Sequence, residues 1–158
     1  MIRSRRSVFA LGMAILVGVL AVNIMPAPCF FGCDVTLSRD EAEDWVTRTV
    51  AAPLPHGVSV PILLLGGFQD KFVQIRLEGP TYQVPVVLEY FGVSLSQLAE
   101  ISSPNMTAST VPWWTVDEIS PTLVAPARIP GFDAARLAIA PNAAAPGLHV
   151  FFLFAHQI

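Results

Sequence analysis

The feature that most constrains this chain is an apolar run near its N-terminus, Ser7 to Met25, which contains no charged side chain. A helix of about 18 residues rises roughly 27 Å, which is close to the ~30 Å hydrocarbon core of a bilayer. Three basic residues precede the run (Arg3, Arg5 and Arg6), whereas the first charge after it is Asp34. Because basic flanks stay on the cytoplasmic side, the sequence predicts a single-pass anchor in the inner (cytoplasmic) membrane. The N-terminus would lie in the cytoplasm and the C-terminal domain would be extracytoplasmic.

A basic and apolar start is also found in signal peptides that are cleaved or lipidated. Cleavage requires small residues around the processing point, but Met25 and Pro28 flank the position at Ala27 where such a site would lie. A lipid-modified start would instead use Cys29 or Cys33. These two cysteines are the only ones in the chain, and in an oxidising compartment they can also form a small local disulfide. The flanks favour retention of the run as an uncleaved anchor.

The chain therefore divides into an anchor and stem, residues 1–33, and one extracytoplasmic domain, residues 34–158. A domain of this length is large enough for one hydrophobic core and too small for two ordinary ones. It contains six basic and all twelve acidic side chains, a net charge of −6. This acidity argues against nucleic acid or anionic lipid headgroups as the partner.

Two segments show the apolar spacing of helices. Ser38 begins a capping-box sequence that ends at Glu41, and the apolar positions that follow predict a helix over 39–51. A second helix is expected over 82–91, with Pro85 in its first turn. A third, short helix would be capped by Ser94 and end at Glu100. The apolar positions of the two main helices recur at i, i+3, i+4 and i+7 (Ala42, Trp45, Val46 and Thr49; Val84, Val87, Leu88 and Phe91).

The other periodic segments alternate as strands do. Residues 58–65 and 71–78 predict a hairpin joined by a glycine-containing connection, and Pro61 places the first of these strands at an edge. Residues 135–140 and 148–156 predict two more strands, with a further one near residue 125. Alternation places Arg136 outward in the first of these and His156 in line with Phe154 in the second. The last strand is apolar on both faces, which indicates an internal position. Alternation in the second strand predicts a dry face and a wet face (Val73, Ile75 and Leu77; Gln74, Arg76 and Glu78).

These elements predict an α+β fold of order α-β-β-α-α-β-β. The N-terminal transmembrane helix would be followed by one small domain with an antiparallel sheet. We expect the two main helices to lie on one face of that sheet, against the dry side of the strand over 71–78.

Candidate functional residues are few, because no catalytic or nucleotide-binding motif is present in the sequence. We therefore expect no enzymatic activity, no cofactor and no metal. Trp113 and Trp114 are adjacent, so in an extended segment one would be core and the other at least partly exposed, where it can contact a partner or a glycan. Asp70, in the connection of the hairpin, is the best placed polar candidate. His149 and His156 lie seven residues apart on one strand, so they point to opposite faces.

Three short stretches carry a resemblance: Pro53-Leu54-Pro55 with Gly57, Gly67-Phe68-Gln69-Asp70 before an alternating strand, and Trp113-Trp114. Over roughly residues 53 to 116 the chain resembles small bacterial envelope and lipoprotein domains that have no assigned activity. The resemblance implies an accessory envelope protein and supplies no catalytic residues.

The expected function is that of a membrane-anchored, non-enzymatic accessory or interaction protein, held in the membrane through residues 7–25 and bound to a protein partner. Two alternatives stay open. One is an immunity or inhibitor protein that neutralises a basic partner, and the other is a periplasmic binder of a small ligand or glycan.

Overall fold

The computed structural model describes residues 34–67, 70–101, 106, 111–116 and 122–157. The apolar run from Ser7 to Met25 and the cysteines Cys29 and Cys33 lie outside these ranges, so the anchor and the cysteine chemistry stay predictions. In the ranges that the structure describes, no helix is both long enough and apolar enough to cross a bilayer.

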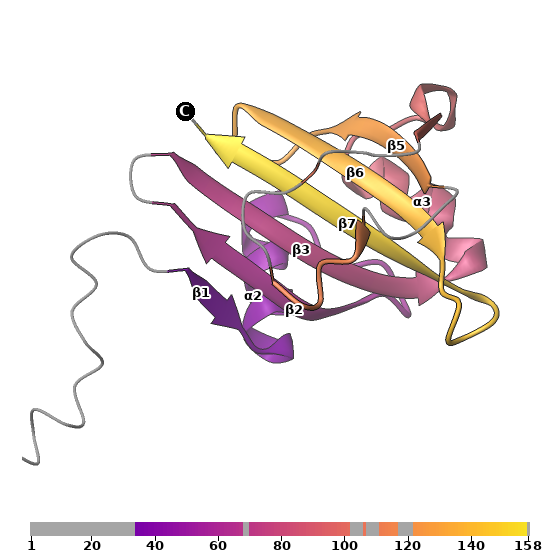
Figure 1. The fold of residues 1–158 in the computed structure, drawn as a ribbon, viewed down its shortest axis with the longest axis horizontal. Helices are drawn as coiled ribbons and strands as arrows, with labels where there is room; N and C mark the ends of the chain where they lie inside the picture. Colours follow the sequence, from indigo (N-terminus) through magenta and orange to yellow (C-terminus); the bar gives the residue numbers. More distant parts are fainter. Residues whose placement is uncertain (1–33, 68–69, 102–105, 107–110, 117–121, 158) are drawn as a thin grey trace, which may run out of the picture. The chain divides into compact units, whose positions relative to one another are not determined.

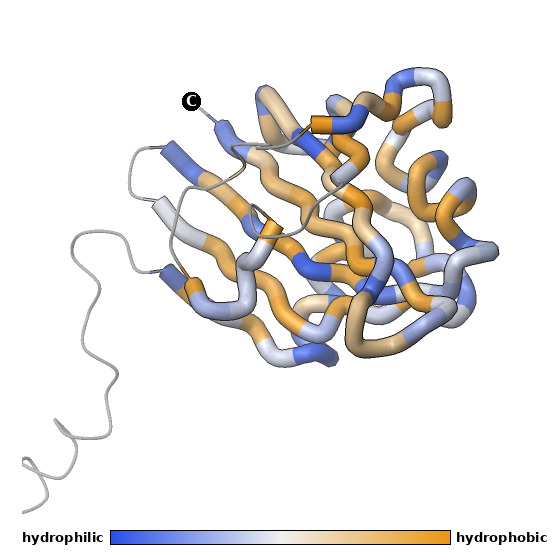
Figure 2. Tube along the Cα trace, turned by 45° about the vertical axis from the view of Figure 1, so that its right-hand side comes forward, coloured by the Kyte–Doolittle hydropathy of each residue, from blue (hydrophilic) through white to orange (hydrophobic). Residues whose placement is uncertain are grey.

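An antiparallel sheet of seven strands forms the described domain, in the order β1-β2-β3-β7-β6-β5-β4 (Figure 1). Strand β7 lies at its centre, paired with β3 on one side and β6 on the other. This confirms the internal position that its apolar residues predicted. Figure 2 shows apolar residues along the strands, with hydrophilic ones interspersed. The strands are β1 (Val35–Leu37), β2 (Ser59–Gly66), β3 (Lys71–Pro80), β4 (Ala99–Ile101), β5 (Thr122–Ala127), β6 (Ala134–Pro141) and β7 (Leu148–Gln157).

Two α-helices, α2 (Arg39–Val50) and α3 (Val84–Tyr90), pack against one face of this sheet (Figure 1). Their buried side chains belong to the same apolar cluster as the inward residues of β3, which confirms the predicted arrangement. The residues concerned are Ala42 and Val46 of α2, Val87 and Leu88 of α3, and Val73, Ile75 and Leu77 of β3. We call this side of the sheet the helix face.

The N-terminus of α2 is held as its sequence predicts. The backbone amide and the hydroxyl of Ser38 both donate to the carboxylate of Glu41, at 2.9 and 2.6 Å. These hydrogen bonds favour the ionised carboxylate, so the Ser38 hydroxyl, and then its amide, lower the pKa of Glu41. An i, i+4 ion pair lies on the exposed side of the helix, with Arg48 2.7 Å from Asp44.

The predicted third helix is wrong beyond its first turn. Ser94 does form a capping box, with its amide donating to Gln97 at 2.7 Å, but only a 3₁₀ turn follows, η2 (Leu95–Gln97). The chain then becomes β4, which pairs with β5. An exposed strand edge offers backbone hydrogen bonds that a short, marginal helix cannot match.

Strand β2 is not the edge strand that Pro61 predicted, because β1 pairs with its second half, Leu63 to Leu65. Strand β1 ends before it reaches Pro61, and the register of β2 with β3 shifts between Ser59 and Ile62. Proline is tolerated at such a bulge, on a stretch that has no strand outside it. The neighbouring Val60 amide donates to Glu43 of α2 at 3.3 Å.

The face of β3 that was expected to be wet is largely covered. Gln74 is fully buried there, and Arg76 and Glu78 form an ion pair at 2.7 Å with only 28% and 27% of their side chains exposed. A second apolar cluster lies on this side of the sheet. It consists of Met106, Trp114, Val116, Val124, Ala138, Val150 and Phe152. We call this side the tryptophan face.

Candidate functional site

The two tryptophans divide as predicted into a core residue and a partly exposed one. Trp114 is 8% exposed and packs edge-on against Phe152 of β7, with ring centroids 5.3 Å apart. Its indole N–H donates to the carbonyl of Met106 at 2.9 Å. Trp113 is half-buried and packs against the edge of the same cluster, 5.6 Å from the ring of Trp114. Trp114 therefore holds segment 111–116 on the sheet, and Trp113 keeps part of its ring accessible.

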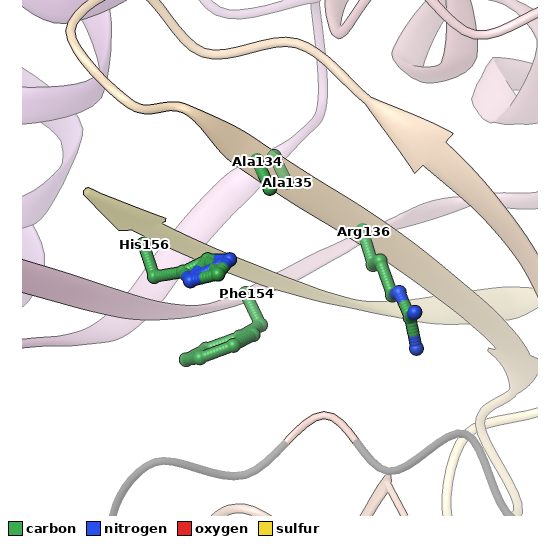
Figure 3. A pocket seen from close by; sticks show the side chains of 5 residues that line it. All are labelled: Ala134, Ala135, Arg136, Phe154 and His156. Atoms are coloured by element: carbon green, nitrogen blue, oxygen red, sulfur yellow. The ribbon is translucent and has the colours of Figure 1, made fainter. Parts of the chain in front are cut away.

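Beside this cluster the tryptophan face carries a cavity of about 240 Å³ (Figure 3). Strand register places its lining residues together, because Arg136 of β6 pairs with Phe154 of β7, and Ala134 pairs with His156. The imidazole of His156 stacks on the ring of Phe154, with centroids 5.9 Å apart and an interplanar angle of 20°. Figure 3 shows these two rings side by side and the Arg136 side chain extending from the neighbouring strand. Phe154 also packs against the tryptophan cluster, so the cavity and Trp113 belong to one surface.

This surface combines flat aromatic rings with a cation. Arg136 is exposed, and Phe154 and His156 are half-buried. A guanidinium binds carboxylate or phosphate in a planar fork geometry, and aromatic rings supply apolar contact area with few torsions to fix. Among the described residues that line the cavity, none has a hydroxyl or thiol that His156 could activate as a nucleophile. The arrangement is therefore suited to binding a partner or ligand that carries a negative group beside an apolar one.

Asp70, the other candidate from the sequence, lies away from the two tryptophans. It is exposed at the beginning of β3, where Lys71 pairs with Gln157. Trp114 contacts Phe152, which pairs with Arg76 of β3. Arg76 lies five positions beyond Lys71 on the same strand, a distance of roughly 17 Å. The preceding Gly67 has a φ of +99°, and a β-carbon there would collide with the Asp70 carbonyl. The connection therefore needs glycine for its backbone, and the structure does not bring Asp70 together with the tryptophans.

The histidines lie apart from one another. His149 and His156 are both on β7 at positions of opposite parity, as predicted, so their side chains leave the sheet on different faces. His149 Nδ1 lies 3.2 Å from the hydroxyl of Thr81, and His56 is exposed before β2. Among the residues that the structure describes, no group of three or more His, Cys, Asp or Glu side chains could hold a metal ion.

The sequence predicted that Arg136 points outward and that His156 is in line with Phe154. It did not predict that these residues lie next to one another on paired strands. The signal that would have done so is the connection between β6 and β7. Once Pro141 is paired with His149 across that connection, counting back along both strands pairs Arg136 with Phe154.

Comparison with known proteins adds no assignment, because no family model, no curated protein and no solved structure matches this chain.

Proposed function

We propose that this chain is a membrane-anchored, non-enzymatic accessory protein of the cell envelope, whose extracytoplasmic domain binds a protein partner through the tryptophan face. The observation that carries the proposal is the cluster of half-buried aromatic residues beside an exposed arginine: Trp113, Phe154, His156 and Arg136. Tryptophan and arginine are the residues most enriched among energetic hot spots of protein interfaces. The charge-free run at residues 7–25 supports the membrane anchor.

The net charge of the domain indicates which kind of protein it would bind. The domain carries a net charge of −6, which favours association with a basic protein. Arg136 is the basic residue of the aromatic surface, and a guanidinium can bind a carboxylate of the partner in addition to the contacts it makes within the chain. A basic partner with one carboxylate among apolar residues fits both features.

Site-specific photo-crosslinking in the full-length chain tests this function. A photoreactive phenylalanine analogue in place of Trp113 should give an adduct of one defined size. The same analogue in place of Tyr82, which is 70% exposed at the approach to α3, should not. Adducts of equal yield at both positions, or none at Trp113, would contradict the proposal.

Charge reversal supplies the matched control. Arg136→Glu should lower the yield of the adduct about tenfold, corresponding to roughly 1.4 kcal/mol. Arg128→Glu makes the same change of charge at an exposed arginine whose amide bonds to Phe91 after α3, and it should leave the yield unchanged. Equal losses in both variants would show that only the total charge matters.

A second candidate function, binding of a small ligand, is favoured by the cavity itself. Its volume of about 240 Å³ and its lining by Arg136, Phe154 and His156 suit a small organic acid with a flat apolar part. With benzoate as probe, the thermal unfolding midpoint should rise in a concentration-dependent manner. A rise that persists unchanged in Arg136→Glu would exclude this cavity as the site.

A further inference from the structure

An apolar groove lies at the end of the sheet where the described chain begins. It has a volume of about 410 Å³ and is lined chiefly by Val35, Trp45, Leu65, Phe72 and Phe132, with Lys71 at its margin. Trp45 and Phe132 meet edge to face, with centroids 6.4 Å apart. Val35 is 48% exposed, and the other four are only half-buried. Most of the groove belongs to the helix-face side, since Trp45 and Phe132 pack against the helix-face cluster. Phe72 is the exception, because it pairs with His156 and by strand alternation lies on the tryptophan-face side.

Backbone register fixes the position of the groove. Val35 pairs with Leu65, and Gly66 pairs with Phe72, so the start of β1 and the β2–β3 connection lie at one end of the sheet. Phe72 in turn pairs with His156 near the end of β7. Figure 1 shows the start of β1, the facing ends of β2 and β3 and the end of β7 at the same end of the sheet. The polypeptide therefore joins the domain at the groove itself.

We infer that this groove is a lipid-contacting surface that rests on the bilayer and takes the acyl-chain region of a zwitterionic phospholipid. The inference rests on the membrane anchor of the proposed function. Nine residues lie between Met25, the end of the apolar run, and Val35, and even fully extended these ten Cα–Cα steps span at most about 36 Å. Because Val35 lies both at the start of β1 and in the lining of the groove, such a tether would keep the groove within reach of the bilayer.

The residue types fit an interface with lipid. Tryptophan and phenylalanine rings are characteristic of the boundary between headgroups and acyl chains, and the ammonium of Lys71 can pair with a lipid phosphate. Asp34 and Asp70 are both exposed at this end of the sheet, and the domain as a whole is acidic. The phosphate of a zwitterionic headgroup can pair with Lys71. Such a membrane surface does not repel the acidic domain as an anionic one would.

Fluorescence quenching in vesicles tests this inference on the full-length chain. The protein is reconstituted in phosphatidylcholine vesicles, with or without bromine atoms on the acyl chains near the headgroup. Bromine quenches only tryptophans in contact with lipid, and the chain has three tryptophans. Brominated lipid should reduce the emission, and Trp45→Phe should remove most of that reduction. Trp113→Phe, the matched control on the tryptophan face, should retain it.

A second variant tests the groove and not only its indole. Val35→Asp places a charge at an exposed position of the lining, where it should leave the fold intact and lower the quenching of Trp45 at least twofold. Quenching that is unchanged in Trp45→Phe would overturn the inference. An unquenched Trp45 in a chain that cross-links as a dimer would also overturn it, because a second copy would then fill the groove.

The membrane anchor and the lipid contact can be disproved separately. If the chain partitions into the soluble fraction, the membrane anchor is wrong and the proposed function falls with the lipid contact. If the chain is held in the membrane and Trp45 is not quenched, the lipid contact alone is wrong.

Discussion

The two faces of the sheet are buried in different ways. On the helix face, α2 and α3 pack their apolar sides against β3 and its neighbours. The first turn of α2 is capped, and that of α3 contains a proline. On the tryptophan face, described residues of an irregular stretch, Met106 and segment 111–116, cover the sheet and are held by one indole and its hydrogen bond to a carbonyl. Regular elements bury area through many small contacts, whereas an irregular segment depends on a few large side chains. On the tryptophan face this arrangement leaves the rings of Trp113 and Phe154 only half-buried, so they remain available for binding.

The largest loss of stability is expected from substitution of two adjacent residues of β7. Both are almost fully buried, one on each face of the sheet. Phe151→Ala on the helix face should lower the free energy of unfolding by about 3 to 5 kcal/mol. Phe152→Ala on the tryptophan face should cost less than Phe151→Ala, because segment 111–116 can settle into the space left behind. Urea denaturation of both variants measures the difference. A larger loss for Phe152→Ala would reverse the comparison.

Trp113 and Trp114 lie on the same face, and their substitution should change stability by different amounts. Trp114→Ala removes the buried indole and its hydrogen bond, so it should lower the free energy of unfolding by about 3 to 5 kcal/mol. Trp113→Ala should cost under about 1 kcal/mol and weaken the partner interaction. Equal losses of stability would mean that the pair serves packing alone. If neither variant lost stability, segment 111–116 would not be part of the fold.

A smaller effect is expected on the helix face at alkaline pH. The Tyr90 hydroxyl donates to the Ala52 carbonyl at 2.8 Å, and burial raises its pKa above the ordinary value of 10.0. The folded state therefore holds the phenolic proton more tightly than the unfolded chain does, and stability should decline as pH rises above about 10. Tyr90→Phe should cost about 1 kcal/mol at neutral pH and should reduce that decline. Thermal unfolding from pH 8 to 11 measures both; an unchanged decline in the variant would contradict the assignment.

The smallest effect is expected at the N-terminus of α2. Because hydrogen bonds from Ser38 lower the pKa of Glu41 below 4.5, this carboxylate stabilises the fold above that pH. The contribution is lost as pH falls through the lowered pKa. Glu41→Gln should be slightly less stable than the parent chain at pH 7, with the difference shrinking below about pH 4.5. Adding Ser38→Ala should cost little more, and full additivity of the two changes would rule out the shared cap.

The candidate site was predictable only in part. The sequence identified Trp113 and Trp114 and their division into a buried and a partly exposed ring, since neighbours in an extended segment point in opposite directions. It also placed Arg136 outward and His156 in line with Phe154 by the same alternation. The adjacency of Arg136 to Phe154 did not follow, because it depends on the register between two strands. Asp70 was a candidate because it is a polar residue in a turn. Turns favour such residues for their backbone conformation, whether or not they have a function.

Local pattern by itself determined the two main helices, the cap at Ser38, the hairpin of β2 and β3 and the central position of β7, because each depends on side chains a few residues apart. Tertiary structure decided the rest. Strands β1 and β4 have three residues each, too few for a periodic signal, and they form because longer strands offer them free edges. The burial of Gln74 was likewise decided by residues more than thirty positions away along the chain. Alternation states which side chains share a face, but what covers that face depends on contacts between segments distant in sequence.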